Sequence, residues 1–462
     1  MAQVFLGMSG GVDSSAAAVL LLERGYCVHG LHLSLLNTLP LPENCPPEDG
    51  SDARAVAQAL ELPFHDLDLS ERFRQTVAAY FIREYEAGRT PNPCVFCNRE
   101  IKFGAMWDAA QALGADYLAT GHYANVARDP VSGRYLLRRG ADRAKDQSYF
   151  LCRLTQEQLS HTLFPLGGLT KPQVRELAEA RGLPTARKRD SQDICFVPDG
   201  DYAGLIARCV GHDSPVGPFL GPDGRVLGQH RGFVRYTKGQ HKGLGLAVEP
   251  PLYVLEKDPA ACAIRLGHNE ELFTMEVVAG DWNWISIPTL TAPMEFTMKL
   301  RYSQKESPAI AEPLADGRVR LRFREAQRAV TPGQFAVLYD GENVVGGGVI
   351  EKYKKVLSCF APARAYYCRA GKGVTENERL CRVLDRHGRR LADWRRNGHD
   401  VALRTGSHEN TGWKEYSKVG YRRGSRRGQY HYRYAMKEAR RKFLRSSLFL
   451  MHIFFVEKVL TF

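Results

Sequence analysis

The fold of the first part of the chain is decided by Gly7-Met8-Ser9-Gly10-Gly11-Val12-Asp13-Ser14-Ser15. This stretch follows a short apolar run, Val4 to Leu6, and precedes a helical pattern from Ala16 to Arg24. Asp13 and Ser14 are expected to cap that helix. Glycines let backbone N–H groups approach phosphate oxygens closely, and a helix N-terminus favours an anion. The sequence therefore predicts a phosphate-binding loop between a strand and a helix.

The loop lacks the lysine of the G-x-x-x-x-G-K-[ST] pattern, so a kinase-like phosphate loop is not expected. Without that lysine it suits holding the β,γ-pyrophosphate of ATP as a leaving group while the α-phosphate is attacked. Asp13 is the candidate ligand for Mg²⁺ on that pyrophosphate. The alternative is a plain glycine turn before a capped helix, which the density of serine and glycine in the motif disfavours.

The first 120 residues alternate strand and helix signals, which favours a parallel sheet with helices on both faces. Ligands of such sheets bind at the carboxyl ends of the strands. Strands are expected at Cys27 to Leu35, Phe64 to Leu69 and Tyr117 to Thr120, helices at Asp52 to Leu60, Glu71 to Ala87 and Glu100 to Leu113, and a Pro/Asn/Cys loop at 90–97.

The sequence pattern changes after about Ala207, from helical periodicity to Gly/Pro-rich segments with short strands. Short strands are expected at Gly232 to Gly245 and at Leu252 to Lys257, and period-two runs between Phe273 and Lys355 indicate an all-β, barrel-like domain. The fold class is thus α/β: a parallel-sheet nucleotide-binding domain (1–207), a small central domain (208–272), a β-barrel-like domain (273–355), and a basic extension without sustained periodicity, for which disorder is one interpretation (356–462).

The formal charge of +13 belongs to that extension. Residues 357–462 hold 24 Lys and Arg against nine Asp and Glu, whereas the preceding residues hold 40 against 42. Arginine pairs interleaved with tyrosines, such as Arg422-Arg423 and Tyr430, suit contact with an RNA backbone. An aberrant extension without a selected function is an equally good interpretation.

No secretory signal precedes the glycine loop, and the longest apolar stretch near the C-terminus, Leu448 to Val456, is too short to span a bilayer. We therefore expect a cytoplasmic protein without a membrane partner. An odd number of cysteines, eleven, fits a reducing compartment. In such a compartment a cysteine pair is more often catalytic or metal-binding than structural.

The motif S-G-G-x-D-S-[ST] after a first strand is similar to the PP-loop of the N-type ATP pyrophosphatases. That superfamily adenylates carbonyl or carboxyl oxygens and expels pyrophosphate. Two cysteine segments narrow the choice within it: Thr90-Pro91-Asn92-Pro93-Cys94-Val95-Phe96-Cys97-Asn98-Arg99 and Asp190-Ser191-Gln192-Asp193-Ile194-Cys195-Phe196. Basic neighbours, Arg99 and Lys102 for the first and Arg187 to Arg189 for the second, are expected to lower the thiol pKa values. Such a pair suits sulfur transfer, in which one thiol carries a persulfide and the other reduces it or resolves a disulfide.

Together with Lys145-Asp146-Gln147-Ser148-Tyr149-Phe150, these motifs resemble the tRNA-specific 2-thiouridylases over residues 1–355. The resemblance implies ATP-dependent adenylation of the 2-carbonyl of the wobble uridine, in tRNAs for Lys, Glu and Gln, followed by replacement of that oxygen by persulfide sulfur. It implies two partners, the tRNA and a sulfur donor, either a cysteine desulfurase or a persulfide relay protein.

The same resemblance assigns roles by position. It makes Cys97 the nucleophile and Cys195 the persulfide carrier. The ATP contacts are Gly7, Met8, Ser9, Gly10, Gly11, Val12, Asp13, Ser14, Leu33 and Gly121. Asn92, Pro93 and Cys94 line the target base. The tRNA contacts are His122, Lys145, Asp146, Gln147, Arg301, Tyr302 and Gln334. Tyr302 also has the chemistry to stack on a base.

Cys94 departs from the family, many members of which carry Asp at this position. The pattern Cys94-x-x-Cys97 with Cys195 supplies three thiols, the ligand set of an iron–sulfur cluster with an open iron. We favour the persulfide route over that cluster. Two further hypotheses stand beside 2-thiolation: a small-molecule amidating ligase with a PP-loop, which lacks any apparent glutaminase segment here, and a non-catalytic RNA-binding protein with a relic nucleotide fold.

Overall fold

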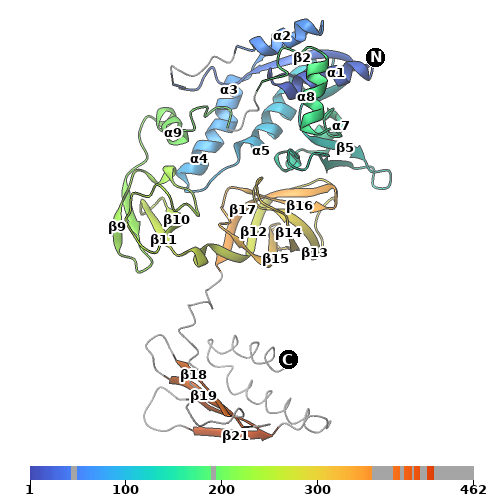
Figure 1. Ribbon diagram of the computed structural model, residues 1–462. Coiled ribbons are helices and arrows are strands. Elements are labelled where there is room, and N and C mark those ends of the chain that lie inside the picture. The colour runs from blue at the N-terminus through green and yellow to red at the C-terminus, as the bar shows by residue number, and fades with distance from the viewer. Residues whose placement is uncertain are drawn as a thin grey trace. The chain divides into compact units, whose positions relative to one another are not determined.

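The computed structural model describes residues 1–42, 49–188 and 194–355, together with four strands between 378 and 420 (Figure 1). The chain forms two compact units, Met1–Ser358 and Cys359–Phe462.

A five-stranded parallel sheet organises the start of the first unit, in the order β3-β2-β1-β4-β7. The strands are β1 (Gln3–Gly7), β2 (Cys27–Ser34), β3 (Phe64–Asp68), β4 (Tyr117–Thr120) and β7 (Thr162–Leu163). In register, Gly7 lies between Leu31 of β2 and Thr120 of β4. The chain runs outward from β1 to β3 and then returns to β4 on the other side. The strand order therefore reverses between β1 and β4, the position at which such sheets bind ligands.

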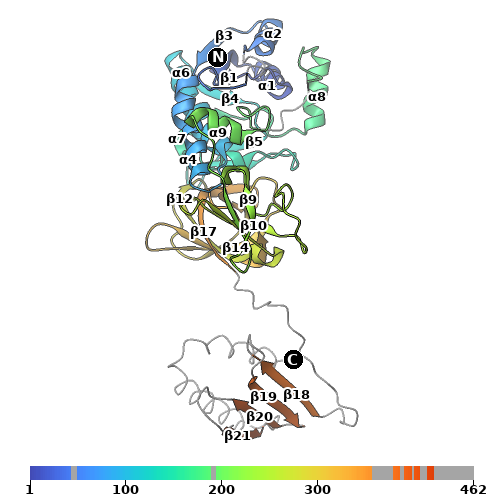
Figure 2. The ribbon, with the colours of Figure 1, turned by 90° about the vertical axis from the view of Figure 1, so that its left-hand side faces the viewer.

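Helices cover both faces of this sheet, which confirms the predicted architecture. Alternate residues of β1 face opposite ways: Val4 and Leu6 pack against α1 and α2, while Phe5 packs against the helix that contains Met106. Figure 2 shows α6 and α8 on opposite sides of β1 and β4. The helices are α1 (Val12–Glu23), α2 (Ser51–Ala59), α3 (Ser70–Phe73), α4 (Ala79–Glu86), α5 (Pro93–Cys97), α6 (Met106–Ala112), α7 (Gln156–Ser160) and α8 (Lys171–Ala180).

Two of these helical stretches contain a π-helical segment, which the sequence did not predict. The first, η1 (Arg74–Ala78), joins α3 to α4, and the second, η2 (Asn98–Ala105), joins α5 to α6. The predicted loop at 90–97 is wrong over its second half, because helix begins at Pro93. The Asn92 side chain accepts a hydrogen bond from Val95 N (3.4 Å), and Pro93 occupies the first helical position, where a missing N–H costs nothing.

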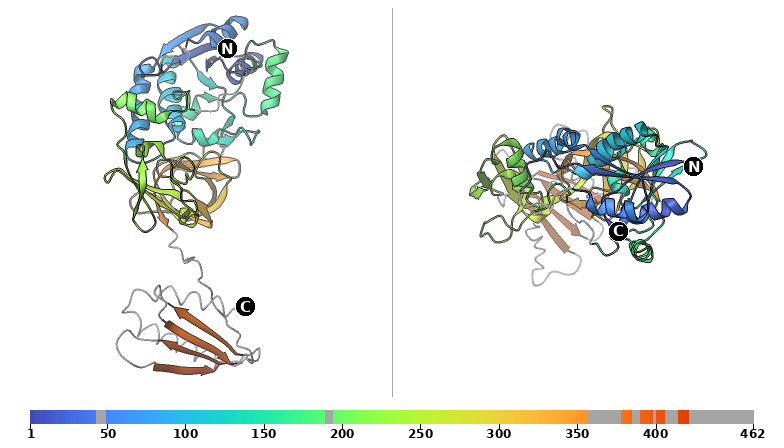
Figure 3. Two further views of the ribbon diagram at one scale, coloured as in Figure 1. Left: turned by 60° about the vertical axis from the view of Figure 1, so that its left-hand side comes forward. Right: turned by 90° about the horizontal axis from the view of Figure 1, so that it is seen from above.

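The central part contains a helix, α9 (Tyr202–Val210), and a four-stranded sheet in the order β10-β11-β8-β9, drawn in green to yellow-green in Figure 3. Its strands are β8 (Gly217–Leu220), β9 (Val226–His230), β10 (Tyr253–Asp258) and β11 (Ala263–Gly267). The strand predicted at Gly232 to Gly245 is wrong. Glycines at positive φ, such as Gly239 at +86°, turn the backbone out of an extended path, and only a short 3₁₀ turn (Phe233–Arg235) forms there.

The predicted barrel is confirmed. Six antiparallel strands run in the order β12-β15-β14-β13-β16-β17, and β12 also pairs with β17, which closes the sheet. They are β12 (Phe273–Trp284), β13 (Met294–Lys299), β14 (Ser307–Pro313), β15 (Val319–Arg328), β16 (Phe335–Asp340) and β17 (Asn343–Lys355). A hairpin of the first domain, β5 (Ala124–Arg128) and β6 (Tyr135–Arg139), extends this sheet through β17. The nucleotide domain and the barrel are thereby joined by backbone pairing.

The second unit holds four antiparallel strands in chain order, where the sequence predicted no periodic structure. They are β18 (Glu378–Leu384), β19 (Arg390–Asn397), β20 (Asp400–Thr405) and β21 (Lys414–Gly420). Among the residues that the structure describes, no helix is both long and apolar enough to cross a membrane.

Candidate active site

The glycine loop turns sharply from β1 into α1. Met8 N donates to Leu31 O of the neighbouring strand (2.7 Å). Gly10 has φ +66°, and a Cβ built there would lie 2.6 Å from Cβ of Asp52, so only glycine fits. Gly11 is the N-cap of α1, and no side chain caps the helix. The predicted caps, Asp13 and Ser14, are therefore wrong: both lie inside the first turn, whose N–H groups carry no side-chain cap and suit a phosphate.

The hydroxyls of this first turn bond to the loop itself. Ser14 and Ser15 donate from Oγ to Gly11 O (3.1 and 2.9 Å), and Thr185 donates to Ser15 Oγ (2.8 Å). Gly121, which follows β4, lies directly against α1. A Cβ there would lie 2.9 Å from Ser14 N, so the β4 loop and the glycine loop touch as backbone on backbone.

Asp13 is held by two residues that the sequence did not single out for this role. Lys171 Nζ donates to both carboxylate oxygens (2.8 and 2.9 Å), and the Tyr123 hydroxyl donates to Oδ1 (2.7 Å). Lys171 is 8% exposed and begins α8, where Thr170 and Gln173 form a capping box. Lys171 thus brings to the loop the ammonium that the loop's own sequence lacks. The Thr170-Lys171-Pro172 helix start is a signal that could have drawn attention to it.

A single carboxylate beside a phosphate site is the usual protein share of Mg²⁺ coordination, with ATP oxygens and water supplying the rest. Asp13 fits that role, with about a third of its side chain exposed. Lys188 completes the loop's surroundings: its Nζ donates to Gly10 O (3.1 Å) and pairs with Asp52. Leu33, the other predicted ATP contact, is half-buried on β2.

The second predicted site lies on the helix that begins with α5. Its start is tied to the barrel, because Gln334 Nε2 donates to Thr90 O and Pro91 O (2.9 and 3.1 Å) and Thr90 N donates to Pro332 O (3.0 Å). Gln334, predicted as a tRNA contact, is therefore the link that holds the start of the cysteine helix. Asn92 caps that helix, and Pro93 is buried.

Cys97 is buried at 8% exposure, whereas Cys94 and Cys195 are exposed as residues. Burial raises the pKa of the Cys97 thiol to about 12, Lys102 opposes that shift, and the neighbouring thiols of Cys195 and Cys94 add to it. Cys94 and Cys195 therefore each lie within electrostatic reach of Cys97. Phe196, which follows Cys195, packs in the same buried cluster as Cys97. None of the three forms a disulfide.

The expectation that basic neighbours lower this pKa is wrong, because desolvation outweighs Lys102. Lys102 is the basic neighbour that opposes the rise, whereas the Arg99 guanidinium pairs with Glu100 (3.4 Å). Burial around the Cys94 thiol raises its pKa as well, again opposed by Lys102. Arg189 and residues 190–193 of the second cysteine motif lie outside the described residues.

The described residues contain no group of three or more His, Cys, Asp or Glu side chains close enough to hold a metal ion. Cys94, Cys97 and Cys195 therefore do not form such a group in the described part of the chain.

His122, the predicted tRNA contact after β4, is buried. Its Nδ1 shares a hydrogen bond with Thr120 Oγ1 (2.7 Å), and its ring packs against Phe103 and Phe164. Burial, and secondarily Lys102, hold its pKa well below the ordinary value, so the imidazole is neutral at pH 7.

In the Lys145-Asp146-Gln147 segment, Asp146 and Gln147 form hydrogen bonds with neighbouring backbone groups. Asp146 is 3% exposed and accepts from Gly140 N and from Ser148 N and Oγ (3.1, 3.1 and 2.9 Å). Gln147 exchanges hydrogen bonds with the Tyr123 backbone, one from each residue (both 2.9 Å). Lys145 and Gln147 are half-buried.

Tyr302 and Arg301 extend from the end of β13 toward that segment. The Tyr302 ring packs on Phe150 (centroids 4.4 Å apart), and Arg301 is exposed with its guanidinium on Arg328 O (3.0 Å). Arg301 thus lies at the surface, while one face of Tyr302 is already occupied.

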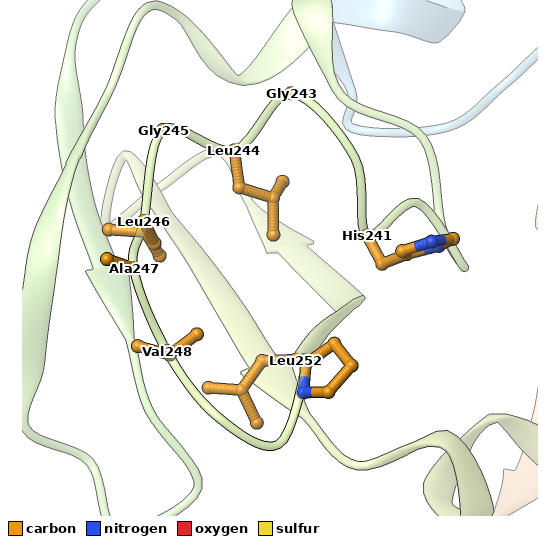
Figure 4. A pocket seen from close by; sticks show the side chains of 9 residues that line it. His241, Gly243, Leu244, Gly245, Leu246, Ala247, Val248 and Leu252 are labelled. Carbon is orange, nitrogen blue, oxygen red and sulfur yellow. The ribbon is translucent and has the colours of Figure 1, made fainter.

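A cavity of about 330 Å³ lies in the central domain and contains none of the predicted site residues (Figure 4). Its walls are mainly the apolar side chains and glycines between Gly243 and Leu252, with His241 as the titratable group. It lacks the convergent polar groups of a catalytic site.

Three family profiles match the chain in succession: the tRNA methyl transferase HUP domain at 2–199, the tRNA methyl transferase PRC-barrel domain at 206–268, and the aminomethyltransferase beta-barrel domain at 274–350. The tRNA-specific 2-thiouridylase MnmA 1 of Caldanaerobacter subterraneus subsp. tengcongensis is 49% identical over 76% of this chain and 98% of its own. The chain belongs to the tRNA-specific 2-thiouridylase family.

The 2-thiouridylase MnmA of Moorella thermoacetica is likewise 49% identical, over 76% of this chain and all of its own. Among solved structures, a 4-thiouridine synthetase in complex with RNA and ATP is 19% identical, covers 43% of this chain and 45% of its own, and gives a TM-score of 0.30. The 2-thiouridylase relatives therefore account for about three-quarters of this chain.

Proposed function

We propose that this protein uses ATP to replace the 2-oxygen of the wobble uridine in tRNA with sulfur. The observation that carries the proposal is an uncapped glycine loop at the sheet's switch point together with a buried thiol, Cys97, within electrostatic reach of two others. The chain is also nearly half identical to 2-thiouridylases over 98% or more of their length.

The ATP half of the reaction follows from the loop. Uracil's 2-carbonyl is a poor electrophile without a leaving group, and transfer of AMP to its oxygen supplies one. The N-terminus of α1 and Lys171 stabilise the departing pyrophosphate. Asp13 is the residue that would hold Mg²⁺, which would supply further positive charge to the pyrophosphate.

The sulfur half follows from the thiols. Cys195 is exposed and suits loading with a persulfide by a donor. The terminal sulfur of that persulfide attacks C2 and AMP leaves, which forms a C–S bond. The buried Cys97 thiolate then attacks the Cys195 sulfur, so that the S–S bond breaks, the thiouridine is released and a Cys97–Cys195 disulfide forms. An external thiol reductant restores both thiols.

We propose Arg301 and Lys145 as contacts to tRNA phosphates, and tRNAs for Lys, Glu and Gln as substrates. About half to two-thirds of the hydrogen bonds in protein–DNA complexes go to phosphate oxygens and sugars, and such cations suit the same groups in RNA. The sulfur donor is a cysteine desulfurase or a persulfide relay protein, and the experiment below can use either.

The test is one assay with ATP, Mg²⁺, unmodified tRNA and a persulfide donor. Thiouridine is measured by mass spectrometry of digested tRNA, and pyrophosphate by a coupled reaction. We expect Cys97→Ser and Cys195→Ser to abolish thiouridine, and Cys27→Ser, at the amino end of β2, to retain it. ATP binding without pyrophosphate release would contradict the proposal and favour a non-catalytic RNA-binding protein.

The persulfide route has its own test. Protein purified without oxygen is analysed for iron and sulfide and then assayed. We expect activity in protein that carries no iron. Stoichiometric iron whose removal abolishes activity would overturn the persulfide route in favour of a cluster on Cys94, Cys97 and Cys195.

A further inference from the structure

The π-helical segment η2 has a consequence for the thiols beside it. In a π-helix the hydrogen bonds run from residue i to i+5, so a residue lies one turn beyond the residue five places before it. Lys102 is five residues after Cys97, and η2 begins directly after Cys97. In a continuous α-helix those two residues would point about 140° apart around the axis. The π-helical turn therefore stacks Lys102 over the end of the helix that carries Cys97.

Two neighbours fix this unusual turn. A Cβ built on Gly104 would lie 2.9 Å from Arg99 O, so a side chain at this position would force the π-helical turn to shift. Gln158 Nε2 donates to both Arg99 O and Phe103 O (2.9 Å each), which satisfies carbonyls that the wider turn exposes. Short π-helical turns of this kind concentrate at functional sites.

The Lys102 side chain is half-buried, and no described residue makes a hydrogen bond or ion pair with its ammonium. His122 lies close by and packs on Phe103, the residue after Lys102. The charges and titratable groups around this ammonium are Cys94 and Cys97 from its own helix and the neutral His122 from the end of β4. Arg99, on the same segment, is instead paired with Glu100 (3.4 Å).

We infer that Lys102 is a positioning residue whose unpaired ammonium, delivered by the π-helical turn, stabilises the Cys97 sulfur as an anion. This inference rests on the proposed function for its purpose, because Cys97 must become a thiolate to attack the Cys195 sulfur. In this inference Gly104 and Gln158 stabilise the π-helical turn η2, and that turn positions the Lys102 ammonium near Cys97. Burial raises the pKa of the Cys97 thiol and Lys102 opposes the rise, in agreement with this geometry.

The test measures the alkylation of Cys97 by iodoacetamide over a pH series, with tandem mass spectrometry to separate Cys97 from Cys94. It uses the full chain without ATP or tRNA, so its result is independent of whether the protein thiolates tRNA. We expect Lys102→Met to slow the reaction about tenfold at a fixed pH for each unit by which the Cys97 pKa rises. Lys102→Arg should restore much of the rate. Arg99→Met, which removes a charge from the same segment, should match the wild type.

Gly104→Ala is the matched structural variant, because it keeps Lys102 but disturbs the turn. We expect it to slow Cys97 alkylation as Lys102→Met does. An alkylation rate and pH profile of Lys102→Met equal to those of Arg99→Met would overturn the inference.

A comparison on the unmutated protein covers the case in which the variants fold poorly. A cation beside Cys97 should raise the rate with anionic iodoacetate relative to neutral iodoacetamide, compared with the same ratio for free cysteine, and salt should reduce the difference. A ratio equal to or below that of free cysteine contradicts the inference.

Discussion

Lys257 is a buried amine that lies outside both halves of the proposed reaction. Its Nζ is buried without a hydrogen-bond partner and lies 5.5 Å from the centre of the Tyr85 ring. Burial lowers the pKa of Lys257 to about 8. Between that pH and the ordinary lysine pKa the unfolded chain binds the proton and the folded chain does not, so stability rises with pH over this window.

We therefore expect Lys257→Met, which keeps the length of the side chain, to stabilise the fold at pH 7 by on the order of 1–3 kcal/mol. The cation–π contact with Tyr85 offsets part of that gain. The gain should shrink as the pH rises from about 8 through the unfolded value. Denaturant unfolding at pH 7 and pH 10 measures it, with exposed Lys242 changed to Met as the control. Destabilisation at pH 7 would show that the amine has a stabilising partner.

Lys171 decides the charge at the glycine loop. Because its ammonium bonds to both Asp13 oxygens, its loss leaves that carboxylate facing the phosphate site without a counter-charge. We expect Lys171→Met to weaken ATP binding roughly tenfold or more, the equivalent of one charged hydrogen bond, and Lys171→Arg to weaken it less. Isothermal titration with ATP and Mg²⁺ measures both variants. Unchanged affinity in Lys171→Met would remove Lys171 from the nucleotide site.

At the scale of elements, the contact between the β4 loop and α1 permits no side chain. A Cβ at Gly121 lies 2.9 Å from both Ser14 N and Asp13 C, whereas one at Gly168 meets nothing within 4 Å. We expect Gly121→Ala to displace the start of α1 and reduce ATP affinity at least tenfold, and Gly168→Ala to leave it unchanged. Equal affinities in the two variants would mean that the loops do not need to touch.

The sequence predicted the strands and helices better than their boundaries and the contacts between them. The strand that ends at Gly7 and the β-barrel strand around Phe335 to Tyr339 were found because alternating or continuous apolar runs report burial directly. Helix α5 was missed because proline and cysteines read as loop, although Asn92 followed by Pro93 is a helix start. The π-helical turn at Gly104 depends on hydrogen bonds from Gln158. The Lys171–Asp13 pair joins residues 158 positions apart. Neither contact can be predicted from a local sequence pattern.

At the scale of the whole molecule, residues 1–355 hold everything that the family profiles match. About three-quarters of this chain aligns with 98% or more of the length of each of the two related enzymes. We therefore expect a protein cut after Ser358, the end of the first unit, to keep its thiolation rate. A loss of that rate would show that the second unit takes part in the reaction.

The basic extension is tested by salt. If it tracks an RNA backbone, the cut lowers tRNA affinity and flattens the dependence of log affinity on log salt, since each phosphate contact adds to that slope. We expect both quantities to change, given the excess of Lys and Arg after residue 357. Filter binding over a salt series measures them, and an unchanged slope would mean that the extension makes no phosphate contacts.

The bonds that complete the glycine loop also set the order in which the protein becomes competent. Asp13 bonds to Lys171, which lies 158 positions further along the chain, and Ser15 bonds to Thr185, which lies 170 positions further. Neither bond can form until its later partner has been synthesised. At a synthesis rate of about 5–20 residues per second, the loop leaves the ribosome roughly ten to thirty seconds before these partners. For roughly the first two-thirds of that interval the strand β1, destined for the centre of the sheet, has no β4 beside it, because β4 ends at Thr120. The nascent chain is therefore most exposed to aggregation just when its nucleotide loop has been made and does not yet work.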